Sequence, residues 1–329
     1  MEMRIIVTGG LGFLGSNLIR LIINKSHFKK IIIVDNLSKS NLAYLKSITK
    51  FKYHESANKY KGTNDRVSVI KADIKNYSFA MKITKGIDAV VHLAAESGID
   101  VSIRYPRKSF NVNIVGTYNY LESCRLNNVG HFIFASSGSV YGNAIPPMRE
   151  NTIKNPISTY GSSKLSIESF CETYSKIFKL KTSILRFSNA YGPYSSHKKS
   201  VVANFIKNII DNKDLNINGD GSITRDYIYS EDIAKAIINC LGHSKNFIDF
   251  NIATGKETSL NRLIKTLITI SREQKYKNIN LKYGKERLGD MKSNSMSPYK
   301  YKKCFKVKKF TTINDGLKST FKWFIENYE

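Results

Sequence analysis

The sequence predicts an α/β fold: a Rossmann-like, doubly wound parallel sheet with a smaller C-terminal substrate-binding lobe. Short apolar, β-branched runs alternate with longer amphipathic stretches, which is the rhythm of strand, helix, strand. The runs are apolar throughout, as expected for strands covered on both faces. A chain of 329 residues is long enough for one large α/β domain and a second lobe.

The expected elements follow from hydrophobic periodicity. The predicted strands are residues 4–8, 30–35, 67–71, 89–93, 131–136 and 182–187, and the predicted helices are residues 13–24, 114–127 and 162–178. After about residue 190 the rhythm breaks, and glycines at 192, 219 and 221 mark turns. A helix over 231–241 and a strand over 247–252 are expected to return to the sheet.

The charge balance excludes little by itself. Net charge is +26, from 52 basic and 26 acidic residues. A nucleic-acid partner would need such charge in clusters, whereas lysines spread over the chain are typical of solvated helix faces, and we favour the second interpretation. Residues 271–310 hold 13 Lys or Arg against 3 Asp or Glu, an excess that would attract a polyanionic substrate such as a diphosphate.

Several features are expected to be absent. No stretch approaches the roughly 18 uninterrupted apolar residues of a membrane span, and the first residues read as a strand and not as a signal peptide. The four cysteines and six histidines are scattered, so neither a disulfide framework nor a metal site is expected. These observations favour a cytoplasmic protein without a membrane or metal partner.

A glycine-rich turn, Thr8-Gly9-Gly10-Leu11-Gly12-Phe13-Leu14-Gly15, joins the first predicted strand to the first predicted helix. Gly9 allows the tight turn, Gly12 lets backbone amides approach a pyrophosphate, and Gly15 permits close packing of helix and strand. The helix amino terminus adds partial positive charge. In this context the pattern predicts a dinucleotide site.

Asp35 specifies the dinucleotide. It ends the second predicted strand, 20 residues after Gly15. A carboxylate there accepts hydrogen bonds from an adenosine ribose diol and repels a 2′-phosphate. The sequence therefore predicts NAD and not NADP.

Tyr160 and Lys164 form a candidate reactive pair at the start of a predicted helix. Their i, i+4 spacing puts phenol and ammonium on one face. We expect the ammonium to lower the pKa of Tyr160, so that the phenolate can act as a general base on a substrate hydroxyl. The spacing alone is typical of solvated helices, but here it follows a dinucleotide turn and a strand that ends in a serine pair.

Taken together, these motifs resemble the extended short-chain dehydrogenases/reductases, the NAD-dependent epimerase/dehydratase family, and most closely its UDP-glucose and UDP-N-acetylglucosamine 4-epimerases. The resemblance covers nearly the whole chain. Beyond the motifs above it rests on residues 35–37, 72–74, 92–95, Asn113 with Gly116-Thr117, 136–142, 186–189, 221–227 and 287–290.

The resemblance implies a role for each matching residue. Tyr160 would be the base, Ser137 would bridge it to the sugar hydroxyl, and Lys164 would hold the nicotinamide ribose. The implied cofactor residues are Gly9, Gly12, Phe13, Leu14, Gly15, Asp35, Asn36, Asp73, Ile74, Leu93, Ala94, Ala95, Asn113, Tyr160, Lys164 and Phe187. The implied substrate residues are Ser137, Ser139, Asn189, Arg225, Arg287 and Asp290, with the two arginines on the diphosphate.

The implied reaction is 4-epimerisation of a UDP-hexose through a 4-keto intermediate, with tightly bound NAD. Family dehydratases carry acidic residues just after the catalytic Ser or Thr, where this chain has Gly138 and Ser139. Asn294 stands where a tyrosine restricts the pocket to unsubstituted hexoses, so N-acetylated substrates are expected to fit. Phe187-Ser188 and residues 195–198 depart from the closest epimerases, which leaves UDP-glucuronate or another nucleotide open.

Two other functions stay open from the sequence: another enzyme of the same superfamily (a reductase, 4,6-dehydratase or decarboxylase) and a non-catalytic basic binding protein. The intact Ser137, Tyr160 and Lys164 set argues against the second. Residues 1–190, with about 224–255 returning to them, are expected to form the NAD-binding domain. Residues 191–223 and 256–329 would form the nucleotide-sugar lobe. A homodimer through the helices over 114–127 and 162–178 is expected.

Overall fold

The computed structural model describes residues 2–62, 64–276, 279–285 and 293–328. The chain divides into two compact units. The first comprises residues 1–144, 150–186 and 234–250, and the second comprises 145–149, 187–233 and 251–329. Compared with the predicted domains, this division assigns residues 145–149, 187–190, 224–233 and 251–255 to the second unit. The NAD-binding and sugar-binding assignments of these parts stay predictions.

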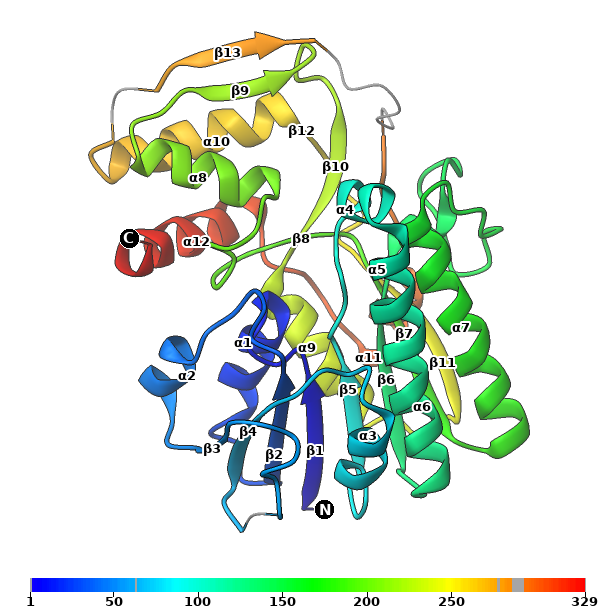
Figure 1. Ribbon diagram of the computed structural model, residues 1–329. Coiled ribbons are helices and arrows are strands. Elements are labelled where there is room, and N and C mark those ends of the chain that lie inside the picture. The colour runs from blue at the N-terminus through cyan, green and yellow to red at the C-terminus, as the bar shows by residue number, and fades with distance from the viewer. Residues whose placement is uncertain (1, 63, 277–278, 286–292, 329) are drawn as a thin grey trace. The chain divides into compact units, whose positions relative to one another are not determined.

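An eight-stranded sheet, which runs through the first unit, has the order β11-β7-β6-β5-β1-β2-β4-β3 (Figure 1). Its strands are β1 (Met3–Thr8), β2 (Phe28–Asp35), β3 (Lys52–His54), β4 (Val67–Lys71), β5 (Ala89–His92), β6 (His131–Ser137), β7 (Lys181–Phe187) and β11 (Phe247–Ile252). β1 pairs in parallel with β2 on one side and β5 on the other. The strand order therefore reverses beside β1, and doubly wound sheets bind ligands at the carboxyl ends of the strands there.

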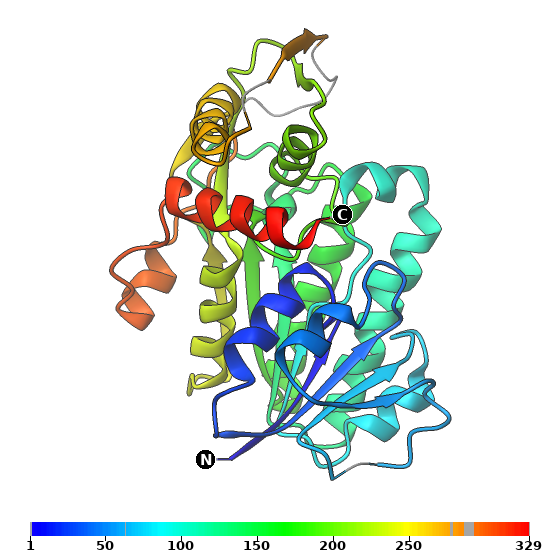
Figure 2. The ribbon, with the colours of Figure 1, turned by 90° about the vertical axis from the view of Figure 1, so that its left-hand side faces the viewer.

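Helices cover both faces of this sheet (Figure 2). α3 (Tyr77–Ile83), α6 (Thr117–Leu126) and α7 (Thr159–Phe178) share one continuous core with inward residues of β1, β2, β4, β5, β6 and β7. α1 (Phe13–Ile22) and α9 (Ser230–Leu241) lie on the opposite face. Shorter elements are α2 (Ala43–Ile48), α4 (Ile99–Arg104), α5 (Pro106–Phe110), the π-helix η1 (Asn111–Gly116) and the 3-10 helix η2 (Gly138–Tyr141).

The predicted strands and helices of the sheet are present, and three helix boundaries differ from the prediction by two or three residues. The helix expected over 114–127 is α-helical only from Thr117, because residues 111–116 form the wider turn of η1. α7 begins at Thr159 and not at 162, since the Ser158 hydroxyl caps it by accepting from the Gly161 amide. α1 ends at Ile22, two residues before the predicted end.

Within its described residues, the second unit contains two small sheets and four helices around its own core. The sheets are β12-β10-β8, from Glu257–Ser259, Thr224–Tyr229 and Asn189–Tyr191, and β13-β9, from Leu281–Gly284 and Leu215–Asn218. The helices are α8 (Val201–Ile210), α10 (Leu260–Glu273), α11 (Tyr299–Phe305) and α12 (Ile313–Asn327). Apolar faces of α8, α10 and α12 meet in the core.

Buried His131 is expected to make stability depend on pH. It lies at the start of β6, and its Nε2 is 2.8 Å from the Ser183 hydroxyl. Burial, reinforced by the charge of Lys181, lowers its pKa to about 3. In the unfolded chain this histidine binds a proton below its ordinary pKa near 6.5, whereas the folded chain does not, so stability is lost as pH falls from 6.5 toward 3.

Changing His131 to glutamine, which keeps a donor for Ser183, should therefore flatten the pH dependence of unfolding. We expect the slope of unfolding free energy between pH 6.5 and 5 to fall by up to about 1.4 kcal/mol per pH unit. Urea titrations across this range measure it, with His27→Gln at an exposed histidine as the control. An unchanged slope in His131→Gln would contradict the assignment.

Candidate active site

The glycine-rich turn is fixed by backbone crowding. Gly9 has φ of +66°, and a Cβ there would lie 2.8 Å from the backbone of Ala94. A Cβ on Gly15 would lie 2.4 Å from the Gly9 carbonyl oxygen. α1 begins directly after Gly12 without a side-chain cap and without an acidic residue in its first turn. The turn thus aims an uncapped helix terminus at the carboxyl end of β1, and such a terminus suits an anion.

Asp35, at the end of β2, holds two turns at once. Its Oδ2 accepts from the Leu11 amide at 3.1 Å, and its Oδ1 accepts from the Leu37 amide at 2.9 Å. The Ser40 hydroxyl donates to the same Oδ1 at 3.0 Å. An ionised carboxylate has about four acceptor positions, so capacity remains for a ribose hydroxyl. Asn36, the next residue, accepts from the Ser38 amide.

The residues after β5 lie against the glycine-rich turn. The Leu93 amide donates to the Thr8 carbonyl at 3.1 Å. Asn113, in η1, fixes the next residues by accepting from the Glu96 amide at 2.8 Å and donating to the Glu96 carbonyl at 3.1 Å. The predicted cofactor residues Leu93, Ala94 and Ala95 therefore stand in a loop whose backbone is set from both sides.

His92 connects the strands beneath this loop. Its Nδ1 is 3.0 Å from the Thr8 hydroxyl and its Nε2 is 3.0 Å from the Thr117 hydroxyl. Burial, together with the charge of Lys164, lowers its pKa to about 3, so the ring is neutral. A neutral imidazole can donate with one nitrogen and accept with the other, which suits two hydroxyl partners.

The structure brings Ser137, Tyr160 and Lys164 together. A Cβ on Gly161 would lie 2.5 Å from the Ser139 carbonyl oxygen, so η2 packs directly on the first turn of α7. The Ser137 side chain lies close enough to the Tyr160 phenol to act on its pKa. The Lys164 ammonium donates to the Ala135 carbonyl at 2.8 Å and lies 5.8 Å from the centre of the Tyr160 ring.

The pKa values of this pair differ from the prediction. Tyr160 was expected to have a lowered pKa, but burial raises its pKa to about 12, although the neighbouring Ser137 side chain acts in the opposite direction. Burial lowers the pKa of Lys164 to about 8, against the charge of Glu168. The i, i+4 spacing correctly predicted that Tyr160 and Lys164 share a helix face. It could not predict that both groups are buried, and burial dominates their pKa values.

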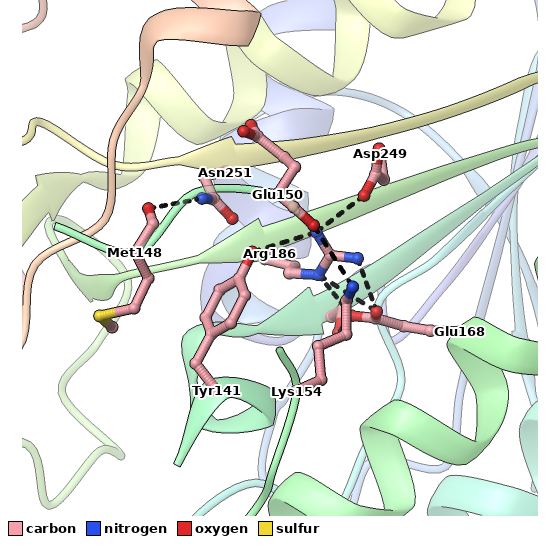
Figure 3. Close-up of polar contacts among 9 residues, drawn as sticks. Tyr141, Met148, Glu150, Lys154, Glu168, Arg186, Asp249 and Asn251 are labelled. Carbon is pink, nitrogen blue, oxygen red and sulfur yellow. Dashed lines mark hydrogen bonds and ion pairs between the residues drawn. The ribbon is translucent and has the colours of Figure 1, made fainter. Parts of the chain in front are cut away.

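Glu168 and Arg186 form the buried charged network that supports the pair (Figure 3). Glu168 lies one turn beyond Lys164 on the same face of α7. Arg186 donates to both of its carboxylate oxygens, from Nη2 at 2.7 Å and from Nε at 2.9 and 3.1 Å. The Ser136 hydroxyl, next to Ser137, donates to Glu168 at 2.5 Å. This network fixes the end of β6 relative to α7.

Two further groups surround the Arg186 guanidinium, whose Nη1 donates to Tyr141 Oη at 3.1 Å and to Asp249 at 2.9 Å. Arg186 is 2% exposed and Glu168 is 4% exposed. Burial lowers the pKa of Arg186, but the hydrogen bond and charge of Glu168 outweigh that effect and raise it, so the arginine stays charged. The carboxylate partners of Arg186 thereby offset the cost of burying its charge.

In the second unit, Asn189 and Arg225 lie on neighbouring strands. β8 and β10 are parallel, with Asn189 opposite Tyr227. Asp226, between Arg225 and Tyr227, is fully buried and accepts from the Thr254 hydroxyl and amide at 2.6 and 2.9 Å and from the Gly255 amide at 2.9 Å. Burial raises the pKa of Asp226, although these hydrogen bonds oppose the rise. Asp226 thereby braces the strand that carries Arg225.

The remaining predicted residues have these positions. Asp73 and Ile74 follow β4, where Ile74 fills the space that a Cβ on Gly116 would need. Phe187 ends β7 and is buried. The Ser139 hydroxyl is buried and has no hydrogen-bond partner. Arg287 and Asp290 lie outside the described residues.

Sequence reasoning assigned no role to Glu168, Arg186 or Glu96. Glu168 continues the i, i+4 series of Tyr160 and Lys164, a signal that could have placed it on the same face. Glu96 has no comparable signal, since its burial depends on Asn113, 17 residues later. Within the described residues, no group of three His, Cys, Asp or Glu could hold a metal ion, and no helix is long and apolar enough to cross a membrane.

Comparison with known proteins identifies the family. A sequence model of the NAD dependent epimerase/dehydratase family matches residues 5–253, about three quarters of the chain. The chain belongs to the NAD dependent epimerase/dehydratase family. Its eight-stranded sheet and smaller C-terminal sheets match the architecture of solved epimerases of this family.

Three relatives show the range of this epimerase/dehydratase family. The putative UDP-glucose 4-epimerase of Methanocaldococcus jannaschii is 34% identical over 264 residues, 79% of each chain. The dTDP-D-glucose 4,6-dehydratase of Homo sapiens is 29% identical over 331 residues, 99% of this chain and 91% of the relative. The structure of Bacillus cereus UDP-glucuronic acid 4-epimerase, in complex with UDP-glucuronic acid and NAD, aligns with a TM-score of 0.86 and 28% identity over 99% of this chain and 100% of that one.

The family match shows an enzyme of the NAD dependent epimerase/dehydratase type, and the relatives named above are enzymes that act on nucleotide sugars. Epimerases and a dehydratase resemble the chain at similar identity, so the reaction has to be argued from the residues of the site.

Replacing Arg186 with methionine should strongly destabilise the epimerase/dehydratase fold, because Glu168 and Asp249 would lose their shared cation. We expect a loss of about 3–5 kcal/mol of unfolding free energy, measured by urea denaturation. Lys59→Met removes the exposed i, i+4 pair with Glu55 and should leave the stability nearly unchanged, because exposed pairs contribute little. An Arg186→Met variant as stable as this control would contradict the role of the network.

Proposed function

We propose that this protein catalyses NAD-dependent 4-epimerisation of a UDP-hexose through a 4-keto intermediate. The observation that carries the proposal is the Ser137 side chain beside the buried Tyr160 phenol, with the buried Lys164 ammonium 5.8 Å from the tyrosine ring. A hydroxyl bridge, a phenol and a fixed cation are the groups needed to remove a proton from a sugar hydroxyl and return it.

The residues of the first unit fit bound NAD. The uncapped amino terminus of α1 would face the pyrophosphate, and Asp35 has acceptor capacity for the adenosine ribose. Phe13 and Leu14 contribute amides of that terminus, and Leu93, Ala94 and Ala95 would line the cofactor. Bound NAD would supply the acceptor and donor of hydride for C4 of the sugar, and its positive charge would help lower the pKa of Tyr160.

Tyr160 then takes the proton of the 4-hydroxyl as the C4 hydride leaves, and it gives the proton back when hydride returns to the other face of C4. Ser137 holds the hydroxyl against the phenol. Lys164, with a pKa near 8, remains mostly protonated at neutral pH and stabilises the phenolate. Asn189 and Arg225 would bind the diphosphate or the sugar, with Arg287 and Asp290 completing this set.

Dehydration is disfavoured by the residues beside Ser137. Removing the 6-hydroxyl needs an acid to protonate it, and Gly138 and Ser139 offer no carboxyl group. One relative is named as a 4,6-dehydratase. The lack of a carboxyl group at positions 138 and 139 of this chain nevertheless supports epimerisation as the first candidate. A UDP-glucuronate epimerase is the second candidate, favoured by the similarity to the Bacillus cereus enzyme.

A panel of UDP-, GDP-, CDP- and dTDP-hexoses tests the proposal directly. We expect a 4-epimer from UDP-glucose, UDP-N-acetylglucosamine or both, without consumption of added NAD(H), detected by chromatography and NMR. The small Asn294 predicts that the N-acetyl group is accepted. Tyr160→Phe should lower turnover by at least about 100-fold and keep bound NAD. A 4-keto-6-deoxy product, or net consumption of NAD(H), would contradict epimerisation.

We also propose a cytoplasmic homodimer. Free cysteines, three of them buried, suit a reducing compartment. On α6 and α7, Tyr118, Phe170 and Phe178 are exposed by 36%, 41% and 47% and join Tyr174 in edge-to-face contacts. A second copy of the chain would cover this apolar face.

Changing Phe170 to glutamate should give a monomer in light scattering after size exclusion, because a charge would be buried in the interface. Ile153→Glu, at an apolar residue 84% exposed elsewhere in the first unit, should leave the dimer intact. Wild-type protein that runs as a monomer would overturn the proposed dimer.

A further inference from the structure

Two loops stand on either side of the glycine-rich turn. Because the sheet order is β5-β1-β2 and all three strands are parallel, the segments after β5 and after β2 flank the segment after β1. The segment after β1 is the glycine-rich turn, which leads to the helix terminus proposed to face the pyrophosphate. Any direct contact between the two outer segments therefore crosses the place proposed for the dinucleotide.

Such a contact exists between Lys39, after β2, and Glu96, after β5. The Lys39 ammonium is paired with Glu96 Oε1. Lys108, at α5, is paired with the other oxygen, Oε2, at 2.8 Å. The Glu96 side chain is 6% exposed, whereas those of Lys39 and Lys108 are 47% and 58% exposed. The buried Glu96 carboxylate is thus shared by two half-exposed lysines, one before it and one after it in the sequence.

Both ends of the Lys39–Glu96 pair are attached to residues of the candidate site. Glu96 is held through its backbone by Asn113, which also donates to the Ser163 hydroxyl at 3.2 Å. Ser163 in turn donates to the Tyr160 carbonyl at 2.8 Å. On the other side, the loop of Lys39 is tied to Asp35 through the Leu37 amide and the Ser40 hydroxyl.

Charge and burial explain why this pair differs from an ordinary surface salt bridge. Exposed pairs contribute about 0–1 kcal/mol, whereas a carboxylate out of water needs a partner to remain ionised. Burial raises the pKa of Glu96, but its hydrogen bonds with Lys108 and Lys39 outweigh this and lower it. If the Lys39–Glu96 pair breaks, Lys108 remains paired with Glu96. The buried carboxylate therefore still has a cationic partner.

We propose that the Lys39–Glu96 ion pair is a clasp across the dinucleotide site, which opens for NAD to leave and slows its release. Lys39 and Glu96 are positioning residues and take no part in the chemistry. Lys108 lowers the cost of opening by remaining on Glu96. The inference rests on the proposed NAD binding of the first unit, and it gives that unit a physical reason to keep NAD through many catalytic cycles.

The test measures how fast purified holoenzyme releases radiolabelled NAD when chased with unlabelled NAD, at low and high NaCl. Lys39→Met should release NAD at least about 5-fold faster than wild type, which corresponds to the loss of roughly 1 kcal/mol. High salt should accelerate release from wild type and have a smaller effect on Lys39→Met, because the screened ion pair is already absent.

Lys108→Met separates a clasp from general loosening of the loop. Without Lys108, opening would leave Glu96 unpaired, so we expect release no faster than in wild type. Lys59→Met, at the exposed pair with Glu55, is the matched control and should release NAD at the wild-type rate. Thermal melting of each NAD-free variant checks that the fold is retained.

The outcomes are distinguishable. Wild type that retains NAD while Lys39→Met releases it at the wild-type rate overturns the clasp and leaves the proposed function standing. Equal acceleration in Lys39→Met and Lys108→Met also overturns the clasp, since it indicates a loosened loop. Wild type that binds no NAD at all overturns both proposals.

Discussion

The Arg186–Glu168 ion pair is the interaction on which the geometry of the candidate site depends. A buried guanidinium is tolerated only when carboxylates neutralise it, and Glu168 and Asp249 do so here. Glu168 also accepts a hydrogen bond from the Ser136 hydroxyl, so one carboxylate fixes the end of β6 relative to the inner face of α7. Ser137 follows Ser136, and Lys164 precedes Glu168 by one turn. The reactive groups are consequently positioned by a charged core and not by the loops alone.

The same principle extends to the proposed cofactor side. His92, Asn113 and Asp35 each bond at least two segments that are distant in sequence, and their partners are mostly backbone amides or hydroxyls. Buried polar groups of this kind are costly unless satisfied, so they specify one arrangement of the loops. Preorganised donors and acceptors lose little free energy to reorganisation when a charge develops on the substrate. We therefore expect NAD to stay bound during a catalytic cycle and the loops around it to keep one arrangement.

Local patterns predicted much of this from the sequence. The glycine-rich turn, the spacing of Asp35, and the Tyr160 and Lys164 pair are short motifs with a defined strand and helix context, and the structure has that context. The π-helical turn at Asn113 and the burial of Glu96 and Glu168 depend on packing between distant segments, which periodicity does not encode. The raised pKa of Tyr160 was missed for the same reason, because burial and not the neighbouring lysine dominates it.

The central claim is that hydride leaves C4 of the sugar and returns to C4 within one site. The most direct measurement follows deuterium in UDP-hexose labelled at C4, incubated with purified enzyme and read by NMR and mass spectrometry. Our account predicts that both 4-epimers keep the label at C4, with no loss to solvent or to added NAD. Deuterium found at C6 of a deoxy product, or transferred to NAD in solution, would contradict it.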